Sequence, residues 1–450
     1  MDLAEIKSER SEDKVITRIK GLNGVYRPPG DEHICHLSLI LGALAEGETK
    51  ILGLAPGQNI QRTIACLQDL GVEIIRDPAS DSLIVIGTGA CSGGLGLVEP
   101  EKELFCGNSA ITAELMAGLL VGQGLNATIV GSEGLCRLPI VEVVEPLRLM
   151  GAEIDLSEEG TLPMRVKGGL LSRITYENPK AYAVTKSSVL IAGLGVSDPV
   201  EYREPVRSRD HVERVLKTFG AKLETKTSGG GRGEYSVMLI PGAPLHGNEI
   251  RIPGDASAAL YLAVAALILP KSDLILKDVG LNPGRREGIH VLTRMGGKIE
   301  IDNRHTVGSE SWCDLHIRRS KLKGIGISGK SVAWLMEDIP ALVVAAAFAE
   351  GESYLKDVEE LRHKETDRIS ALVHNLKVLG LEVGEYPDGL IFRGKQVHDG
   401  GEFDSFGDYR VALACHAAAL ACHGESTVMN YEVASDFWPA FTEAVEVLKV

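Results

Sequence analysis

The pattern of apolar and polar positions repeats along this chain. Five times, an amphipathic helix ends at a glycine and a strand follows, as in LQDLGVEI (67–74), PLRLMGAEI (146–154), LKTFGAKL (216–223), LTRMGGKI (292–299) and NLKVLGLEV (375–383). Glycine suits this position because the residue after a helix often takes a left-handed conformation. An alanine- and leucine-rich helix and a strand precede each copy, and ALACHAAALACHGESTVMNY begins a sixth. The pattern predicts an α/β fold with six helix–strand–helix–strand units and extra strands in the variable stretch of the units.

A second repeat divides these six units into two groups. PPGD at 28–31 recurs as IPGD at 252–255, each time before a helix of apolar and small residues. We interpret the two segments as chain crossings between domains, with Asp31 and Asp255 capping the helices that follow. The predicted N-terminal domain is 28–251, and the C-terminal domain combines 1–27 with 252–450. Helix N-termini facing a shared cleft would suit an anionic small molecule.

Composition and charge narrow the function classes. The 450 residues carry a formal net charge of −15, which argues against nucleic acid or an anionic membrane as partner. No apolar run is long enough for a membrane span, and the acidic N-terminus is unlike a targeting peptide. The eight cysteines form no CxxC pair, so we expect reduced thiols and a cytoplasmic protein. The glycine-rich stretches lack the pattern of a dinucleotide site, and we expect no cofactor.

The helix start at 28–47 presents a contradiction. Its sequence is built like an anion-binding N-terminus, yet Glu32 follows the Asp31 cap and no lysine or arginine appears before Lys50. This helix start therefore has the geometry of an anion site without its cations.

Candidate cations and acids lie mainly in the second half. In EELRHKETDR (359–368), helical spacing places Lys364 and Arg368 on one face with Glu365 beside them, which suits an anion clamp with a proton-transfer carboxylate. Arg410 begins a later alanine-rich helix, and Glu337 and Asp338 precede another. Solvated ion pairs and helix caps are the alternative interpretation of all these residues.

Several motifs together resemble the 5-enolpyruvylshikimate-3-phosphate synthase family of enolpyruvyl transferases, from about residue 16 to the end. They are PGD (29–31), CGNS (106–109), SRDH (208–211), PGDASAA (253–259), LNPGR (281–285), EELRHKETDR and DYR (408–410). The resemblance implies two domains of three repeats each, an inverse α/β barrel architecture, with a cleft between the domains. A sister family acting on UDP-N-acetylglucosamine shares this fold, but HKETDR favours the shikimate branch.

The resemblance also implies roles for individual residues. In the family, a hydroxyl of a phosphorylated shikimate adds to the enol carbon of phosphoenolpyruvate, and phosphate leaves. Lys364 would contact substrate, Glu365 would act in acid–base catalysis, and Arg368 and Arg410 would hold phosphoenolpyruvate. Glu337 and Asp338 correspond to the family's catalytic aspartate and glutamate in swapped order.

In the N-terminal domain the chain departs from the family's pattern. Asn108 is kept, and Arg209 lies in the SRDH motif. Glu32 replaces a lysine, Leu37 and Leu138 replace arginines, Glu114 stands where an arginine is expected, and Tyr182–Val184 replaces a Ser-Ala-Gln segment. Each reversal of charge is worth roughly 1–4 kcal/mol against an anionic group at contact distance. We therefore expect a cleft that excludes phosphorylated shikimate.

Three functional hypotheses follow. The favoured one is a carboxyvinyl transferase-like enzyme acting on phosphoenolpyruvate and an unphosphorylated or amine-bearing acceptor, held between Lys364, Arg368 and Arg410 on one side and Glu32 and Glu114 on the other. Elimination or isomerisation is a variant of it. The others are a ligand-binding protein without catalysis, and a genuine synthase in which Arg27, Arg137 and Lys186 replace the missing cations.

His33, Cys35 and His36 raise the question of a metal site. Imidazole and thiolate are good zinc ligands, but neighbouring positions at a helix start cannot all point at one ion. We therefore expect no metal there.

Overall fold

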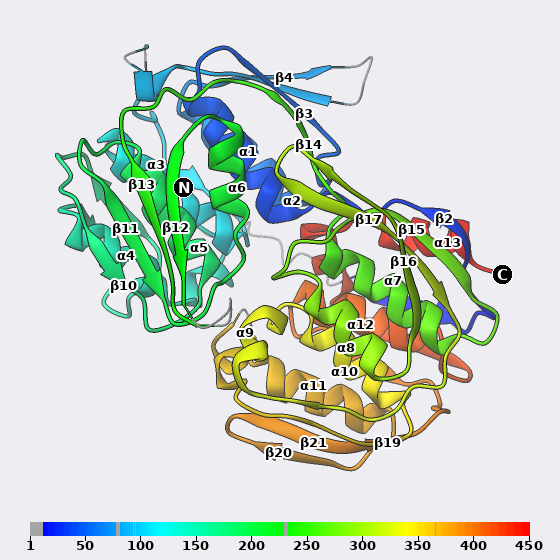
Figure 1. Ribbon diagram of the computed structural model, residues 1–450. Coiled ribbons are helices and arrows are strands. Elements are labelled where there is room, and N and C mark those ends of the chain that lie inside the picture. The colour runs from blue at the N-terminus through cyan, green and yellow to red at the C-terminus, as the bar shows by residue number, and fades with distance from the viewer. Residues whose placement is uncertain (1–11, 78–81, 93, 95, 229–232, 365) are drawn as a thin grey trace, which may run out of the picture.

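The computed structural model describes residues 12–77, 82–92, 94, 96–228, 233–364 and 366–450. It shows two lobes joined by two adjacent chain segments (Figure 1). One hydrophobic core collects buried residues between Ile34 and Ile252, and the other collects Ile16, Leu22 and residues from Ala256 to Leu448. The two cores support the predicted domain bounds, which stay a prediction.

The first lobe contains three units, each with its own sheet. The first unit comprises α1 (Glu32–Leu44), β3 (Glu48–Leu52), α2 (Gln58–Asp69), β4 (Glu73–Asp77), β5 (Ser82–Ile86) and the late strand β14 (Glu249–Arg251). The second comprises β6 (Leu104–Phe105), α3 (Ala110–Gln123), β7 (Ala127–Val130), α4 (Val141–Leu149), β8 (Glu153–Asp155) and β9 (Met164–Lys167). The third comprises β10 (Thr175–Glu177), α5 (Ala183–Gly193), β11 (Val200–Glu204), α6 (His211–Thr218), β12 (Lys222–Thr227) and β13 (Tyr235–Ile240).

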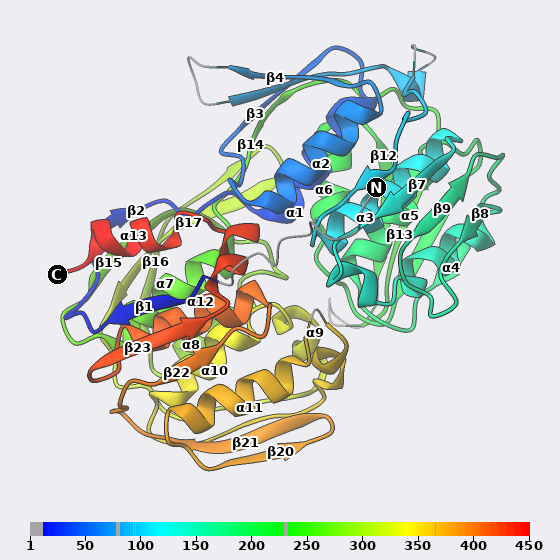
Figure 2. The ribbon, with the colours of Figure 1, turned by 180° about the vertical axis from the view of Figure 1, so that it is seen from behind.

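The second lobe repeats this plan. Its first unit comprises β2 (Asn23–Tyr26), α7 (Ala256–Ile268), β15 (Asp273–Gly280), α8 (Glu287–Arg294), β16 (Lys298–Val307) and β17 (Glu310–Arg318). The next comprises β18 (Gly326–Ile327), α9 (Val332–Leu335), α10 (Ile339–Ala347), β19 (Gly351–Leu355), α11 (Arg368–Val378), β20 (Val383–Tyr386) and β21 (Gly389–Gly394). The last comprises β22 (Glu402–Asp404), α12 (Tyr409–Ala419), β23 (Glu425–Met429), α13 (Phe441–Leu448) and β1 (Lys14–Thr17). Figure 2 shows β1 lying beside β23 in this lobe.

Five of the six sheets share one strand order, and the sixth has three strands, β1-β23-β22. In five sheets a parallel pair is followed by two antiparallel strands, as in β14-β3-β5-β4 and β18-β19-β21-β20. Each of these units therefore ends in a two-strand hairpin and gains a parallel strand, and these are the strands beyond the helix–strand–helix–strand pattern. The added strands pair the edges of the central strand, whose backbone groups would otherwise lack partners.

The helices lie inside and the sheets outside. All thirteen residues of α7 and all nine of α10 are buried, and Figure 1 shows α7, α10 and α12 surrounded by the sheets of their lobe. This is the predicted inverse α/β arrangement, although the sheets stay separate and none closes into a barrel among the described residues. The predicted helix-ending glycines have positive φ, from 71° at Gly380 to 103° at Gly151. No helix in the described part of the chain is long and apolar enough to cross a membrane.

The two segments that join the lobes run side by side. The amide of Asp31 donates to the carbonyl of Pro253 at 2.8 Å, and the amide of Asp255 donates to that of Pro29 at 2.7 Å. As predicted, the Asp31 carboxylate caps α1 and the Asp255 carboxylate caps α7. A side chain at Gly30 would lie 2.0 Å from the carbonyl oxygen of Gly53, so glycine is required for this close approach.

Candidate active site

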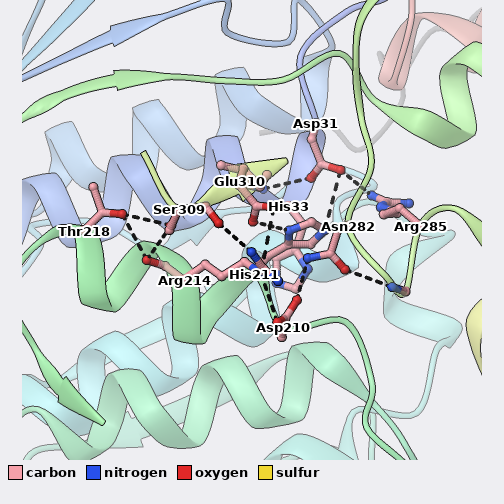
Figure 3. A network of polar contacts seen from close by, with 12 residues as sticks. Asp31, His33, Asp210, His211, Arg214, Thr218, Asn282, Arg285, Ser309 and Glu310 are labelled. Carbon is pink, nitrogen blue, oxygen red and sulfur yellow. Dashed lines mark hydrogen bonds and ion pairs between the residues drawn. The ribbon is translucent and has the colours of Figure 1, made fainter. Parts of the chain in front are cut away.

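A network of charged side chains ties the two joining segments to both lobes (Figure 3). Arg285 pairs with Asp31 at 3.0 Å and with Asp255 at 3.2 Å. His211 lies 2.9 Å from Glu310 and 3.8 Å from Asp31. The PGD, SRDH and LNPGR motifs therefore meet at the domain junction, where they fix the direction in which α1 and α7 point.

The lobes face each other across a cleft of 890 Å³. Among its lining residues are most of the predicted site residues, namely Glu32, Asn108, Glu114, Arg209, Glu337, Lys364, Arg368 and Arg410. The cleft therefore brings together residues from the starts of six different helices or from the turns before them. The indole N–H of Trp334 donates to the carbonyl of Arg207 in the opposite lobe at 2.6 Å, which adds a contact between the lobes.

The predicted cations gather on one side of this cleft. Arg368 is the first residue of α11 and is 1% exposed, and Arg410 is the second residue of α12. Lys364 lies 2.5 Å from Glu360, and its ammonium sits 5.3 Å from the ring centre of Tyr182 in the opposite lobe. These groups form a basic surface that can hold a carboxylate or a phosphate.

Glu337 lies among these cations. Its carboxylate contacts Arg410 and is 3.7 Å from Arg368 and 3.9 Å from Arg209. Burial alone would raise the pKa of Glu337, but the surrounding arginines outweigh burial and hold it well below its usual value. Glu337 is therefore ionised at any physiological pH.

Asp338, also predicted as catalytic, points away from the cleft. It is 3% exposed, and its carboxylate accepts a hydrogen bond from Ser257 at 2.5 Å. Burial raises its pKa to about 7. Asp338 is not among the cleft-lining residues, but Ser257, to which it is hydrogen-bonded, does line the cleft. Glu365, the predicted acid–base residue, lies outside the described residues.

The opposite side of the cleft carries carboxylates. Glu32 accepts from the Asn59 amide at 2.7 Å, and burial raises its pKa to about 7. Glu114 is 7% exposed and accepts from the Tyr182 hydroxyl at 3.2 Å. Asn108 donates to Asp436 at 3.3 Å. Glu32 and Glu114, both in the first lobe, thus stand opposite the basic surface, and the Asn108–Asp436 contact joins the two lobes.

The three cations considered as replacements for the missing ones lie elsewhere. Lys186 is fully buried between Glu204 at 3.1 Å and Glu213 at 2.8 Å. Arg137 pairs with Glu133 on the surface, and Arg27 pairs with Asp278 at 3.3 Å. None of these three side chains is among the residues that line the cleft in the described structure.

The residues considered for a metal site have separate partners. His33 lies 3.1 Å from the Ser187 hydroxyl, His36 lies 2.8 Å from the Thr63 hydroxyl, and the Cys35 sulfur accepts from the Ala55 amide at 3.3 Å. The described residues contain no group of three or more histidine, cysteine or acidic side chains arranged to hold a metal.

Sequence reasoning missed several cleft residues. They are Asn59, Glu142, Lys180, Glu360, Tyr409 and Asp436. Two had a signal in the sequence, because Tyr409 precedes Arg410 in GDYR and Glu360 stands four residues before Lys364. Asn59 and Asp436 had none, since each reaches the cleft only through the packing of α2 and of the segment before α13.

Comparisons with known proteins agree with this architecture. The chain matches the EPSP synthase family (3-phosphoshikimate 1-carboxyvinyltransferase) over residues 16–445. A 3-phosphoshikimate 1-carboxyvinyltransferase from Desulforudis audaxviator is 41% identical, over 97% of this chain and 99% of the relative, and one from Synechococcus sp. (strain JA-3-3Ab) is 41% identical, over 95% of each.

Solved structures extend the match to three dimensions. EPSP synthase from Acinetobacter baumannii superposes with a TM-score of 0.83 at 34% identity, covering 97% of this chain and 98% of that one. The enolpyruvyl transferase NikO from Streptomyces tendae shares the fold, with a TM-score of 0.72 at 17% identity and coverage of 97% and 98%. The chain therefore belongs to the EPSP synthase family, whose members are transferases of the carboxyvinyl-transferring type.

Proposed function

We propose that this protein transfers the carboxyvinyl group of phosphoenolpyruvate to a hydroxyl of an acceptor that is less negative than shikimate 3-phosphate. The observation that carries this proposal is the division of charge in the cleft. The first lobe contributes Glu32 and Glu114 to the cleft, and the second lobe contributes Lys364, Arg368 and Arg410. The cations of the first lobe are paired with carboxylates, Lys180 with Glu142 and Arg209 with Glu337.

The basic side supports phosphoenolpyruvate as the donor. Arg368 and Arg410 present guanidinium groups, which suit a carboxylate or phosphate in bidentate geometry. Lys364 adds a third cation beside them. Hydroxyl addition to the enol carbon and loss of phosphate need a group that moves a proton, and we assign that role to Glu365 by its place in the HKETDR motif.

The acidic side supports an acceptor without a phosphate. A phosphate group close to Glu32 or Glu114 would meet repulsion of roughly 1–4 kcal/mol for each carboxylate. The same carboxylates would attract an amine or accept hydrogen bonds from hydroxyl groups. An unphosphorylated or amine-bearing cyclic alcohol therefore fits this side of the cleft.

Shikimate 3-phosphate itself is the second candidate acceptor, and the names of the curated relatives favour it. Arg27, Arg137 and Lys186 were considered as replacements for the family's missing cations, but none of them lines the cleft in the described structure. The phosphate of shikimate 3-phosphate would therefore have to bind without these three cations.

Phosphate release by the purified protein separates these alternatives. Phosphoenolpyruvate is supplied with shikimate 3-phosphate, with shikimate, or with an amino analogue of shikimate, and Glu365→Gln serves as the control. We expect release with an uncharged or amino acceptor and its loss in the control. Rapid release with shikimate 3-phosphate alone would establish the second candidate. Ligand binding without release from any pair would favour a protein that binds but does not turn over.

The cellular location stays a prediction. All eight cysteines are free, and six of them are buried, which supports the expected cytoplasmic environment.

A further inference from the structure

Glu337 is placed like a ligand of the basic surface. Its carboxylate lies within 3.7 Å of Arg368 and 3.9 Å of Arg209, and it contacts Arg410 directly. Arg209 belongs to the first lobe, and the other two arginines belong to the second. A carboxylate in this position bridges the cleft and neutralises part of the charge that an external anion would need. We call Arg209, Arg368 and Arg410 the arginine clamp.

We propose that Glu337 is an internal anion of the arginine clamp, and that an external carboxylate or phosphate binds there only by displacing it. This proposal rests on the proposed function only in assigning Arg368 and Arg410 to the anionic donor. Glu337 is thereby a specificity-determining residue, because it lowers the affinity of the clamp for every anion and leaves neutral acceptors unaffected.

The order of the two acids explains why the carboxylate reaches the clamp. Asp338 has the shorter side chain and is held by Ser257 behind the cleft. Glu337, with one more methylene, extends into the cleft and reaches arginines at the starts of α11 and α12. An aspartate at position 337 would end about one methylene short of the same guanidinium groups.

Competition follows from this geometry. Glu337 is tethered beside the clamp, so its effective concentration is high and an external anion has to overcome it. It also remains charged across the physiological range, as its arginine contacts dictate. Acidification to pH 5 should therefore leave this competition in place.

The test measures anion affinity in the absence of an acceptor. Phosphoenolpyruvate and inorganic sulfate are titrated calorimetrically into the wild-type protein, Glu337→Gln and Glu337→Asp. Trp334, three residues from Glu337 in the sequence, gives a second readout by fluorescence. We expect Glu337→Gln to bind both anions about tenfold more tightly or better, and Glu337→Asp about threefold more tightly.

Glu142→Gln is the matched control. Glu142 also lines the cleft, but it pairs with Lys180 and touches none of the clamp arginines. This variant removes the same formal charge from the cleft, so it should change both affinities by less than about threefold. An equal effect of Glu142→Gln and Glu337→Gln, or weaker anion binding in Glu337→Gln, would overturn the proposal.

Two features keep the outcome interpretable. If Glu337→Gln does not fold, Glu337→Asp retains the charge and the prediction is tested on that variant, where unchanged affinity would overturn it. The test involves no turnover, so its failure is distinct from failure of the proposed function, which is decided by phosphate release with each acceptor.

Discussion

The hydroxyl of Tyr182 lies 3.2 Å from the carboxylate of Glu114. Tyr182 precedes α5 and Glu114 lies on α3, so the pair connects two buried helices of the same lobe at the wall of the cleft. The family pattern has a serine and an arginine at these positions. A neutral donor paired with a carboxylate therefore stands where a hydroxyl and a cation would bind phosphate.

Removing this hydroxyl should destabilise the protein. Tyr182→Phe takes one hydrogen-bond donor from the buried carboxylate of Glu114, and we expect a loss of about 1–2 kcal/mol in the free energy of unfolding. Urea unfolding followed by circular dichroism measures it. Tyr176→Phe is the control, because the contact described for Tyr176 is a ring contact with Tyr202. Equal losses in the two variants would contradict the assigned role of the hydroxyl.

Restoring cations to the acidic side should change the preferred acceptor. Glu32 and Leu138 both line the cleft, and the double variant Glu32→Lys with Leu138→Arg returns the family's charges to these positions. We expect shikimate 3-phosphate to bind at least about a hundredfold more tightly, because two favourable charge interactions replace one repulsion and one apolar contact.

Calorimetric titration of shikimate 3-phosphate measures this gain. The neutral pair Glu32→Gln with Leu138→Met is the control, since it removes the repulsion without adding cations. A gain of the same size in the control would show that repulsion by Glu32 accounts for the whole effect. No gain in either variant would contradict the assignment of these positions to the acceptor phosphate.

The buried position of Glu32 predicts a pH dependence of stability. Burial raises the pKa of Glu32 from 4.5 to about 7, so the folded protein holds this proton more tightly than the unfolded chain does. Stability should therefore fall as pH rises from about 4.5 to 7. Because the Glu32 side chain is partly open to the cleft, we expect the free energy of unfolding to fall by about 1–2 kcal/mol over this pH range. Unfolding of wild type and Glu32→Gln at pH 5 and pH 8 measures it, and a constant difference would contradict the prediction.

The repeat and the helix-capping aspartates followed from the sequence pattern, and the placement of the helices inside the sheets followed from the family resemblance. They depend on local signals, such as the glycine at Gly220 or the carboxylate of Asp255, whose consequences lie within a few residues. The pairing of the added parallel strands did not follow from the sequence pattern. For example, β14 pairs with β3, which lies some two hundred residues earlier in the chain. The candidate site was predicted in part, since Arg368 and Arg410 begin recognisable helices.

Side-chain direction was the part of the site that the sequence could not provide. Glu337 and Asp338 are neighbours, yet one enters the arginine clamp and the other turns to Ser257. Lys186, considered as a substitute cation, is instead enclosed by Glu204 and Glu213. Each outcome is decided by the packing of other units, which no local pattern encodes.

His211 should contribute most to the stability of the domain junction at low pH. Burial lowers the pKa of His211, but Asp31 and Glu310 outweigh it, so the pKa lies above its usual value. A raised histidine pKa contributes stability that is complete below about pH 6.5 and is lost as pH rises through the folded-state value. Glu310→Gln removes one of the two carboxylates responsible, and we expect it to cost about 2–4 kcal/mol at pH 6.

Thermal and urea unfolding of the wild type and Glu310→Gln at pH 6 and pH 9 test this sign. The difference in the free energy of unfolding between the two proteins should shrink at pH 9, because His211 is then losing its proton in both. Glu300→Gln is the control, since Glu300 pairs with His316 at 3.7 Å on an exposed strand and should cost less than about 1 kcal/mol at either pH. An equal cost of Glu310→Gln at pH 6 and pH 9 would mean that Glu310 acts through Arg214, 4.0 Å away, and not through a protonated His211.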